Sequence, residues 1–564
     1  MNNKFLMIFY FLGLIIINKE VLAQSDEDLG VQEVQVTEYF IPDVPEAIKL
    51  ADKPMLSDTI KVNKNISYKP LIRRFESQLK LNPIKSAKIK GESLSKIYNT
   101  YIYGGLGNMS MPTSKIFYSS DRNKSFNYGF TLGYLESYSD VKSSLDNKQK
   151  VSAAFRKTNF STYVKKDFDF GIINTFFSRQ GNVFQAYGYN PNLKLEEQIT
   201  QQYWGYSSVS MSLQSKNKYN SKPTYYAKLF AYDLNEQTEN LVSCLMTGQQ
   251  TFGLYNYSLD LKMDYYFNNI SDKYIFVDSL AKELLLTFNP SVSRELGDGN
   301  LNFGFELKSI DLRNSKENSY AIYPQIHYDY IFSENNQSIN AGLRGGLNKN
   351  SYWTLSKINP FILDPYITDS GSLKLKNTET KYDIYLGINS NLGAGMIFTS
   401  ELSFSRVNDM FFFDLDEKST YQNKFNVIYD DVNHLLWTSQ INWDINSKSI
   451  LNIQLDYHNY NLDSLQEYAY KPSLVSKLNF CYDIGDKILS SFELIGKFNR
   501  SKSDNSASSV SLNNIVDLNF DLEYKYSSVF SAFFKVRNMI GSYEIWENYP
   551  VLSPQIFFGL SFCF

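Results

Sequence analysis

The chain is poor in the residues and runs that several protein classes need. Its 564 residues include only three cysteines, three histidines and five tryptophans, and the formal net charge is -3. The wide spacing of Cys244, Cys481 and Cys563 argues against a disulfide framework or a zinc site. The nearly balanced charge gives no reason to expect a nucleic-acid partner. After residue 17, no run approaches the roughly 20 apolar residues of a membrane-spanning helix.

The first residues are typical of an export signal. Lys4 supplies a positive charge, residues 5–17 form an apolar stretch, and residues 21–23 (Val-Leu-Ala) have the form of a small-residue cleavage site. We therefore expect a signal peptide over residues 1–23 and a mature chain that starts at Gln24. Since none of the cysteines stands at that position, we do not expect a lipoprotein.

Aromatic side chains are in excess, and they alternate with polar ones. The chain has 43 Tyr and 41 Phe, yet its mean hydropathy is only -0.33. In residues 555–564, one face of a strand would carry Ile556, Phe558, Leu560, Phe562 and Phe564, and the other Gln555, Phe557, Gly559, Ser561 and Cys563. Alternate residues of a strand lie on opposite faces. In a transmembrane β-barrel one face meets lipid and the other lines a polar lumen.

The same alternation recurs in residues 301–308, 451–458 and 516–526. In the last segment the polar face would hold Asp517, Asn519, Asp521, Glu523 and Lys525. Side chains of this kind cannot all be buried in a dry core without partners, but they can line a hydrated lumen. We therefore expect arginine to be costly at Leu518 or Phe520, on the lipid face, and mild at Asn519.

These patterns predict an all-β protein, a large antiparallel transmembrane β-barrel over residues 99–564. Counting the alternating runs gives about 20 strands, in the range 18–22, since bacterial barrels close with even numbers. Tight turns at residues 483–486 and 527–528 alternate with long irregular stretches at 349–380 and 501–511. Short periplasmic turns and long extracellular loops are typical of outer-membrane barrels.

Residues 24–98 differ from the rest. Alternation is lost, prolines recur, and acidic residues come early while basic residues come late. We expect an extended, Pro-interrupted periplasmic or lumenal arm. Two alternatives stay open for it: a disordered tail, or an arm that docks inside the barrel or on a periplasmic partner.

Several motifs together resemble a known family. They are Gly105-Leu106-Gly107-Asn108 with Pro112, Asn359-Pro360 with Lys376-Asn377-Thr378 and Tyr385-Leu386-Gly387, residues 424–431 (KFNVIYDD), and Tyr543-x-x-Trp546-x-x-Tyr549-Pro550. In this order they look like the TonB-dependent-receptor-like outer-membrane barrels of the Bacteroidota. The resemblance implies an outer-membrane location and a large barrel, and for true receptors it implies energised nutrient uptake.

One departure from that family bears on function. True receptors carry a globular plug before the first strand, and a folded domain needs on the order of 100 residues. Only residues 24–98 are available, so the chain resembles a receptor without a plug. Residues 33–37 (EVQVT) faintly resemble the segment that engages TonB, but short matches of this kind are common. We do not expect TonB coupling.

No catalytic, cofactor or metal site is expected, and the chain is not expected to be an enzyme. His327 and His458 lie in predicted strands and His434 at the start of one. Asp456 and His458 share a face, but no nucleophile is placed beside them, so we interpret them as two lumen-facing polar residues.

The tyrosines Tyr460, Tyr468 and Tyr470 fit either an interfacial girdle or a binding surface for sugars or a partner protein. Both readings predict exposure near the lipid headgroups.

Three functions remain open. The first is an accessory or structural subunit of an outer-membrane transport or assembly complex, with envelope proteins bound through the arm and the extracellular loops. The second is a passive or gated conduit for solutes or lipids, and the third a TonB-linked receptor. We favour the first, because no plug is present for TonB to act on. Besides envelope proteins, the expected partner is outer-membrane lipid.

Overall fold

The structure, a computed structural model, describes residues 97–564 except 147, 194–199, 217–221, 236–238, 268–281, 313–317, 334–336, 364–374, 417–420, 503–509, 542 and 553. The chain separates into two compact units, Met1–Gly91 and Glu92–Phe564. The second unit contains all described residues. The expected signal peptide and nearly all of the expected arm lie outside them.

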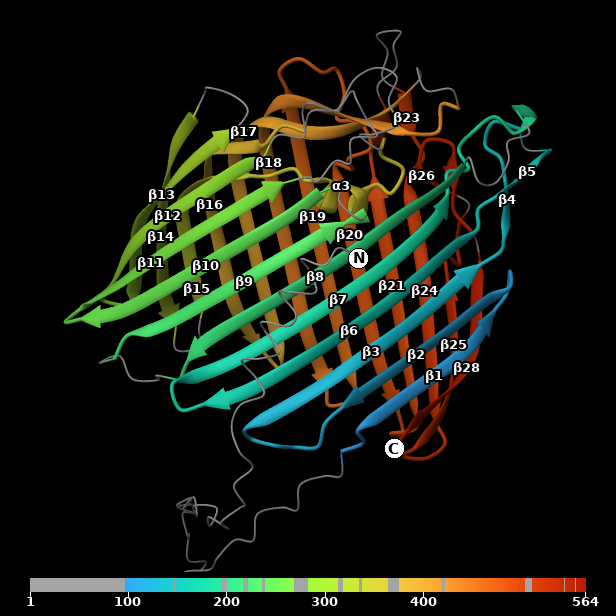
Figure 1. Cartoon of the computed structure of the whole chain (residues 1–564), viewed down its shortest axis with the longest axis horizontal. Helices are drawn as coiled ribbons and strands as arrows, with labels where there is room; N and C mark the ends of the chain where they lie inside the picture. Colours follow the sequence, from blue (N-terminus) through green and yellow to red (C-terminus); the bar gives the residue numbers. More distant parts are fainter. Residues whose placement is uncertain are drawn as a thin grey trace, which may run out of the picture. The chain divides into compact units, whose positions relative to one another are not determined.

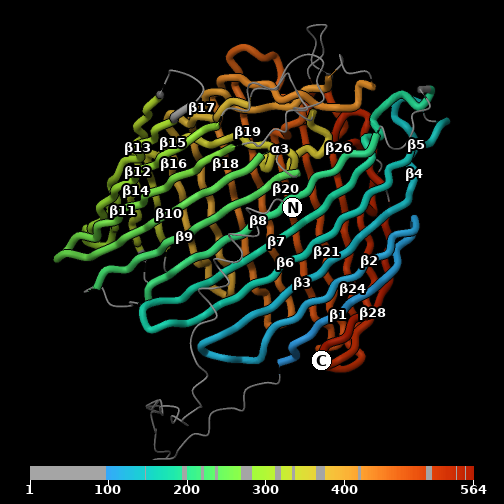
Figure 2. Tube along the Cα trace, in the orientation of Figure 1, coloured from blue at the N-terminus to red at the C-terminus, as the bar shows by residue number. Residues whose placement is uncertain are grey.

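The second unit is one closed antiparallel sheet of 22 strands. Each strand pairs with the next in the ring, and β28 pairs with β1, so no edge is left open. In Figure 2 the blue β1 and the red β28 lie side by side where the ring closes. The predicted barrel is confirmed, with a strand number at the upper end of the expected range.

Most strands exceed ten residues. In ring order they are β1 (Thr100–Gly107), β2 (Met111–Ser119), β3 (Phe126–Ser137), β6 (Phe155–Phe168), β7 (Gly171–Gln185), β8 (Gln201–Ser215), β9 (Thr224–Leu234), β10 (Glu239–Phe252), β11 (Tyr255–Phe267), β12 (Glu283–Leu296), β13 (Gly299–Leu312), β14 (Asn318–Ser333), β15 (Gln337–Asn348), β16 (Thr378–Gly393), β17 (Met396–Leu415), β18 (Phe425–Asn446), β19 (Ser449–Leu462), β20 (Leu474–Ile484), β21 (Ile488–Phe498), β24 (Ile515–Lys525), β25 (Phe530–Arg537) and β28 (Gln555–Cys563).

The two ends of the barrel differ in their connections. At one end, which we call the turn end, several connections are two residues long, as at 253–254, 297–298 and 447–448. The first strand, β1, begins at this end, and the last strand, β28, finishes there. At the other, the loop end, long connections carry their own elements: β4 (Asp140–Lys142), β5 (Lys150–Ser152), η1 (Pro191–Leu193), α3 (Tyr352–Ile358), β22 (Arg500–Lys502), β23 (Val510–Leu512), β26 (Glu544–Trp546) and β27 (Tyr549–Pro550). Figure 1 shows α3, β23 and β26 gathered at this end.

This distribution is the one expected for periplasmic turns and extracellular loops. Within the described residues, no helix has the length and apolar character needed to cross a membrane.

The two faces of the strands follow the predicted alternation. On β28, Phe558 is 61% exposed on the outer face, whereas Ser561 on the inner face is 1% exposed. Tyr524 and Tyr526 of the segment 516–526 are also exposed, and Asp517 is buried. An apolar outer surface and a polar inner one are what a bilayer requires of a barrel. The outer-membrane location predicted from the sequence is therefore confirmed by the fold.

Two details of the sequence prediction are wrong. Asn519 is only 8% exposed, donates to Glu493 and accepts from the backbone N–H of Asn538, so arginine there would not be mild. His434 lies well inside β18, which begins at Phe425. Alternation reports which face a residue occupies, but neither the packing of that face nor how far a strand extends beyond the bilayer.

Candidate functional site

The loop end is covered by a packed apolar cluster, which we call the lid. It contains residues from the β7–β8, β15–β16, β19–β20 and β25–β28 connections and from the tips of β8, β9, β17 and β18. Its buried members are Ala186, Trp204, Tyr206, Leu234, Tyr352, Leu355, Phe361, Ile362, Phe413, Phe425, Val427, Ala469, Tyr470 and Tyr549.

The helix α3 is fixed at its start by two caps. Ser351 is the N-cap, and its side chain accepts from the backbone N–H of Thr354, whose hydroxyl accepts in turn from the backbone N–H of Ser351. The carboxylate of Glu239, at the tip of β10, accepts from the backbone N–H groups of Tyr352 (2.8 Å) and Trp353 (3.2 Å). A negative charge at a helix N-terminus is favourable. The barrel wall therefore holds α3 by its first turn.

A second buried carboxylate holds the same connection. Glu283, at the tip of β12, pairs with Lys349 before α3 and accepts from Asn377 (2.9 Å) after it. Both glutamates are under 10% exposed. Buried charges need partners, so removal of either carboxylate would leave buried donors unpaired and loosen the loop.

Aromatic contacts also hold α3 against the barrel wall. The Trp353 ring lies 4.3 Å from the Tyr232 ring and is stacked on it, and the Tyr206 ring meets Trp353 edge-on at 5.1 Å. The Tyr206 hydroxyl hydrogen-bonds Ser356 at 2.9 Å. Aromatic pairs of this kind add about 0.5–1.5 kcal/mol beyond the area they bury.

The lid spans the mouth of the barrel. In the ring, β8 stands almost opposite β18. The indole N–H of Trp204, on β8, donates to the carbonyl of Pro360 (2.8 Å), and the segment after Pro360 exchanges backbone bonds with Phe425, at the start of β18. The side chain of Asn423 also donates to the carbonyl of Ala186 across the mouth (2.7 Å). Opposite walls are therefore joined through the lid.

The last connection of the barrel inserts into the same cluster. The Tyr549 ring stacks on Phe361 at 3.8 Å, and Trp546 meets Phe425 at 5.6 Å. Tyr470 donates to Glu547 at 3.0 Å, and burial raises its pKa well above the usual value of a tyrosine. Three of the motifs that carry the family resemblance, at Asn359-Pro360, 424–431 and 543–550, thus meet in the lid.

The expectation for the tyrosine group is wrong. Tyr470 is 8% exposed within the lid. Tyr460 lies on the inner face of β19, stacked on His434 (4.7 Å) and tilted against Tyr468 (5.3 Å). These side chains do not face the headgroups, because the connection that carries them folds over the mouth instead of outward. Asp456 and His458 do lie on the lumen face, as predicted; the nearest ring nitrogen to His458 is that of His434, at 3.1 Å.

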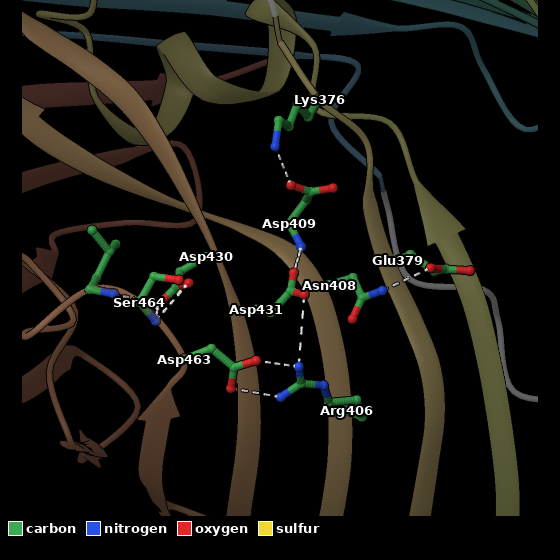
Figure 3. A network of polar contacts seen from close by, with 10 residues as sticks. Lys376, Glu379, Arg406, Asn408, Asp409, Asp430, Asp431, Asp463 and Ser464 are labelled. Atoms are coloured by element: carbon green, nitrogen blue, oxygen red, sulfur yellow. Dashed lines mark hydrogen bonds and ion pairs between the residues drawn. The ribbon is translucent and has the colours of Figure 1, made fainter.

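An ion network ties the lid to the wall, as Figure 3 shows. Arg406 of β17 forms a bidentate ion pair with Asp463, and its guanidinium lies 3.7 Å from the carboxylate of Asp431. The backbone N–H of Asp409 donates to Asp431 (2.9 Å), and the carboxylate of Asp409 pairs with Lys376 (2.6 Å). The hydrogen bond from Arg406 lowers the pKa of Asp463. Two loops, before β16 and after β19, are held by this network.

Replacing Arg406 with glutamine is expected to release the connection after β19. Digestion of the folded protein in detergent at Glu467 should become faster, because Asp463 loses its bidentate partner. The exposed Arg156, 4.0 Å from Glu136, is the matched control, and its glutamine variant should cleave at the wild-type rate. Since the pKa of Asp463 is lowered, the pairing persists above the unfolded pKa of about 3.9 and is lost only as the pH falls through the lower, folded value. Wild-type cleavage rates in Arg406→Gln would contradict this role.

Lys471 is enclosed by aromatic rings beneath the lid. Its ammonium lies 4.5 Å from the centre of Phe412, 4.6 Å from Phe411 and 5.8 Å from Tyr460. Within the described residues it has no carboxylate partner. Rings supply partial compensation for the lost hydration. Burial nevertheless lowers the pKa of Lys471 to about 7.

This lysine makes lid stability depend on pH. Since the unfolded loop binds the proton up to about pH 10.4 and the folded loop only to about 7, stability should rise with pH between these values and be lower at pH 7 and below. Thermal unfolding in detergent from pH 7 to 10 tests this. Lys471→Met should remove most of the rise, whereas the turn-end variant Lys448→Met should retain it. An unchanged slope in Lys471→Met would contradict the assignment.

Below the lid, the inner wall carries a polar cavity of about 590 Å³, which we call the trough. It lies along β9–β16, on their turn-end halves, and is lined mainly by amides and hydroxyls. The buried side-chain oxygens of Asn289 and Asn302 have no hydrogen-bond partner among the described residues. Water or a polar solute could supply the missing donors.

One side of the trough carries a hydrogen-bonded chain of charged and aromatic groups. Asp329 bonds His327 (2.6 Å), His327 bonds the Tyr385 hydroxyl (2.5 Å), and the Arg344 guanidinium lies 4.3 Å from the centre of the Tyr385 ring. Arg344 also pairs with Asp383 (2.7 Å) and Glu401 (2.8 Å). Its charge is therefore already balanced by the wall. The trough offers a nearly neutral polar surface.

Comparison with known proteins shows the fold. No protein-family model matches the chain, and no curated protein matches it. Among solved structures, the FrpB iron transporter from Neisseria meningitidis (F3-3 variant) is similar, with a TM-score of 0.62, 9% identity, and coverage of 84% of this chain and 82% of that one. The pyoverdine outer membrane receptor FpvA from Pseudomonas aeruginosa PAO1 is similar with a TM-score of 0.59 and 9% identity, and the match covers 84% of this chain and 79% of that one. The copper transporter OprC is similar with a TM-score of 0.56 and 11% identity, and the match covers 83% of this chain and 80% of that one.

By their descriptions these neighbours are transporters and an outer-membrane receptor. At such low identity the likeness concerns the fold alone. The chain thus shares the closed barrel fold of these transporters, as expected for a protein of the outer membrane.

Proposed function

We propose that the protein is a closed, receptor-like outer-membrane barrel without a plug, similar to those of the Bacteroidota, which serves as a subunit of an outer-membrane transport or assembly complex. The observation that carries the proposal is the lid, because hydrogen bonds through it join β8 to β18 across the mouth. A barrel closed by its own loops does not take up solutes from outside unless the lid moves. Its loops instead form a folded surface that a partner can bind.

The partners we propose are envelope proteins, bound through the extracellular loops and through the arm of residues 24–98, together with outer-membrane lipid. The absence of a plug is proposed from the Pro-interrupted sequence of that arm. Since a plug is the part of a receptor on which TonB acts, no TonB coupling is proposed.

A second candidate function is a gated conduit for small polar solutes. The trough favours it, because unpaired amide oxygens line a cavity of about 590 Å³ on the lumen side. A conduit of this kind would require the lid to open.

Two measurements on the full chain separate these functions. In planar bilayers the purified protein should show no steady currents, and after extraction from outer membranes it should co-purify with a defined set of envelope proteins that a second, unrelated barrel does not retain. Stable open-channel currents from a protein without companions would overturn the subunit role and support the conduit.

A further inference from the structure

The wall of the barrel is lowest where the ring closes. The four consecutive strands β25, β28, β1 and β2, which we call the short sector, have 8, 9, 8 and 9 residues. Elsewhere β17 has 20 residues and β18 has 22. A transmembrane strand tilted by about 45° needs roughly 9–11 residues. The short sector is at or below the length that spans the hydrocarbon layer.

This shortage of length acts on the bilayer. Eight residues at a rise of about 3.3 Å, tilted by about 40°, give a wall of roughly 20 Å, against an apolar band of about 25 Å. A hydrophobic surface shorter than the bilayer thins the adjacent lipid. We therefore expect the lipid headgroups of the two leaflets to lie closest to each other, and to the lumen, beside this sector.

The junction of β28 and β1 has one pair without side chains on its inner face. Gly105 stands directly opposite Gly559. Cross-strand side-chain pairs are a main source of sheet stability, and this pair contributes none. The Phe533 ring, from β25, lies over both glycines: a Cβ at Gly105 would stand 2.9 Å from it. One aromatic side chain thus covers the junction from the lumen.

The inner surface beside the short sector carries aromatic rings, with the Lys535 ammonium 5.5 Å from the Tyr103 ring and 5.0 Å from the Phe533 ring. Tyr103 meets Phe533 edge-on at 5.4 Å, and Phe557 is 9% exposed in a second apolar cluster with Met111. The trough lies on β9–β16, which includes the wall opposite this junction in the ring. The lumen therefore has aromatic rings with a cation on one side and a polar trough on the other.

We propose that the short sector is a lateral opening through which a single-chain or double-chain amphipathic lipid exchanges between the bilayer and the lumen. The β1–β28 junction parts while Phe533 moves aside. The polar headgroup enters toward the trough, and the acyl chain stays against the Tyr103 and Phe533 rings or in the bilayer. The lid closes the axial route at the loop end, so the lateral route does not depend on opening it. The proposal is independent of the subunit role above.

The native cysteines allow the junction to be locked. Cys563 of β28 lies opposite Tyr101 of β1, both on the lumen side. The neighbouring pair Thr100 and Phe564 exchanges both backbone hydrogen bonds, so Tyr101 and Cys563 form a non-hydrogen-bonded pair with Cα atoms about 4.5 Å apart, within disulfide range. The variant Tyr101→Cys can therefore be compared in its oxidised and reduced forms.

A matched lock is available elsewhere in the ring. Cys481 of β20 lies opposite Ser491 of β21, with Sγ and Oγ 3.7 Å apart. The variant Ser491→Cys, oxidised, fixes a strand pair outside the short sector.

The test uses the full chain in phosphatidylcholine nanodiscs that contain a lysophosphatidylcholine with a photoactivatable diazirine on its acyl chain. After illumination, mass spectrometry should find label on the lumen-facing Tyr103 and Phe533. Oxidised Tyr101→Cys should lose most of this label, reduction should restore it, and oxidised Ser491→Cys should keep it. Label that persists in oxidised Tyr101→Cys would overturn the proposal, because lipid would then reach the lumen by another route. Absence of lumen label in the wild-type protein would overturn it as well.

Discussion

Glu239→Ala is expected to produce a barrel that passes ion currents, whereas the wild-type protein should show none. The substitution removes the acceptor for the N–H groups of Tyr352 and Trp353 and for the Tyr232 hydroxyl. Leaving buried donors unpaired costs about 1–3 kcal/mol for each group. Since α3 holds the centre of the lid, its release should open the mouth. Single-channel recording in planar bilayers measures the effect.

The control is Glu295→Ala, which removes an exposed carboxylate at the turn end of β12. It should stay as silent as the wild-type protein. Heat-modifiable migration on gels shows for both variants that the barrel is intact. If Glu239→Ala folds and remains silent, while its connection 349–377 becomes accessible to protease, the lid is not what closes the lumen. Wild-type protease resistance would instead show that Glu239 does not hold α3.

Met246→Arg is expected to destabilise the barrel by about 2–4 kcal/mol, the cost of a cation on the lipid face near the bilayer midplane. Met246 is 53% exposed on the outer face of β10. It precedes the turn-end residue Phe252 by six positions, which places it about 15 Å from that end. Urea unfolding from lipid vesicles measures the change.

The lumen-facing Gln249 of the same strand is the matched control. It is exposed and lines the trough, where an arginine stays hydrated. Gln249→Arg should therefore change the unfolding free energy little. Equal losses at Met246 and Gln249 would show that the two faces have been assigned to the wrong sides.

The barrel could be predicted from sequence because its signal is local. Alternation in β28 and β24 reports, within one strand, which side chains meet lipid. The predicted range of 18–22 strands includes the observed 22, at its upper end because short strands such as β25 give few alternations to count. Asn519 shows the limit of this signal: the face is correct, but its hydrogen bonds to Glu493 and Asn538 come from other strands.

The lid could not be predicted in the same way. Its contacts join residues far apart in the chain, such as Trp204 with Pro360 and Phe361 with Tyr549, and they follow no period. The motifs at Asn359-Pro360, 424–431 and 543–550 stand out only by their resemblance to a family. Nothing in their sequence indicates that the three segments contact one another in the lid. The prediction that the tyrosines near residue 470 are exposed at the headgroups is wrong for the same reason. Aromatic residues beside polar ones fit a membrane interface as well as a folded loop core.

The lid also has a consequence for biogenesis. Trp204 and Phe425 stand on opposite walls, and the segment 359–363 reaches both. These partners come within reach only after the strands from β8 to β18 have paired and the sheet has curved enough to bring the two walls face to face. The lid must then form after this part of the wall, and its resistance to external protease would report that the wall has taken its curved form.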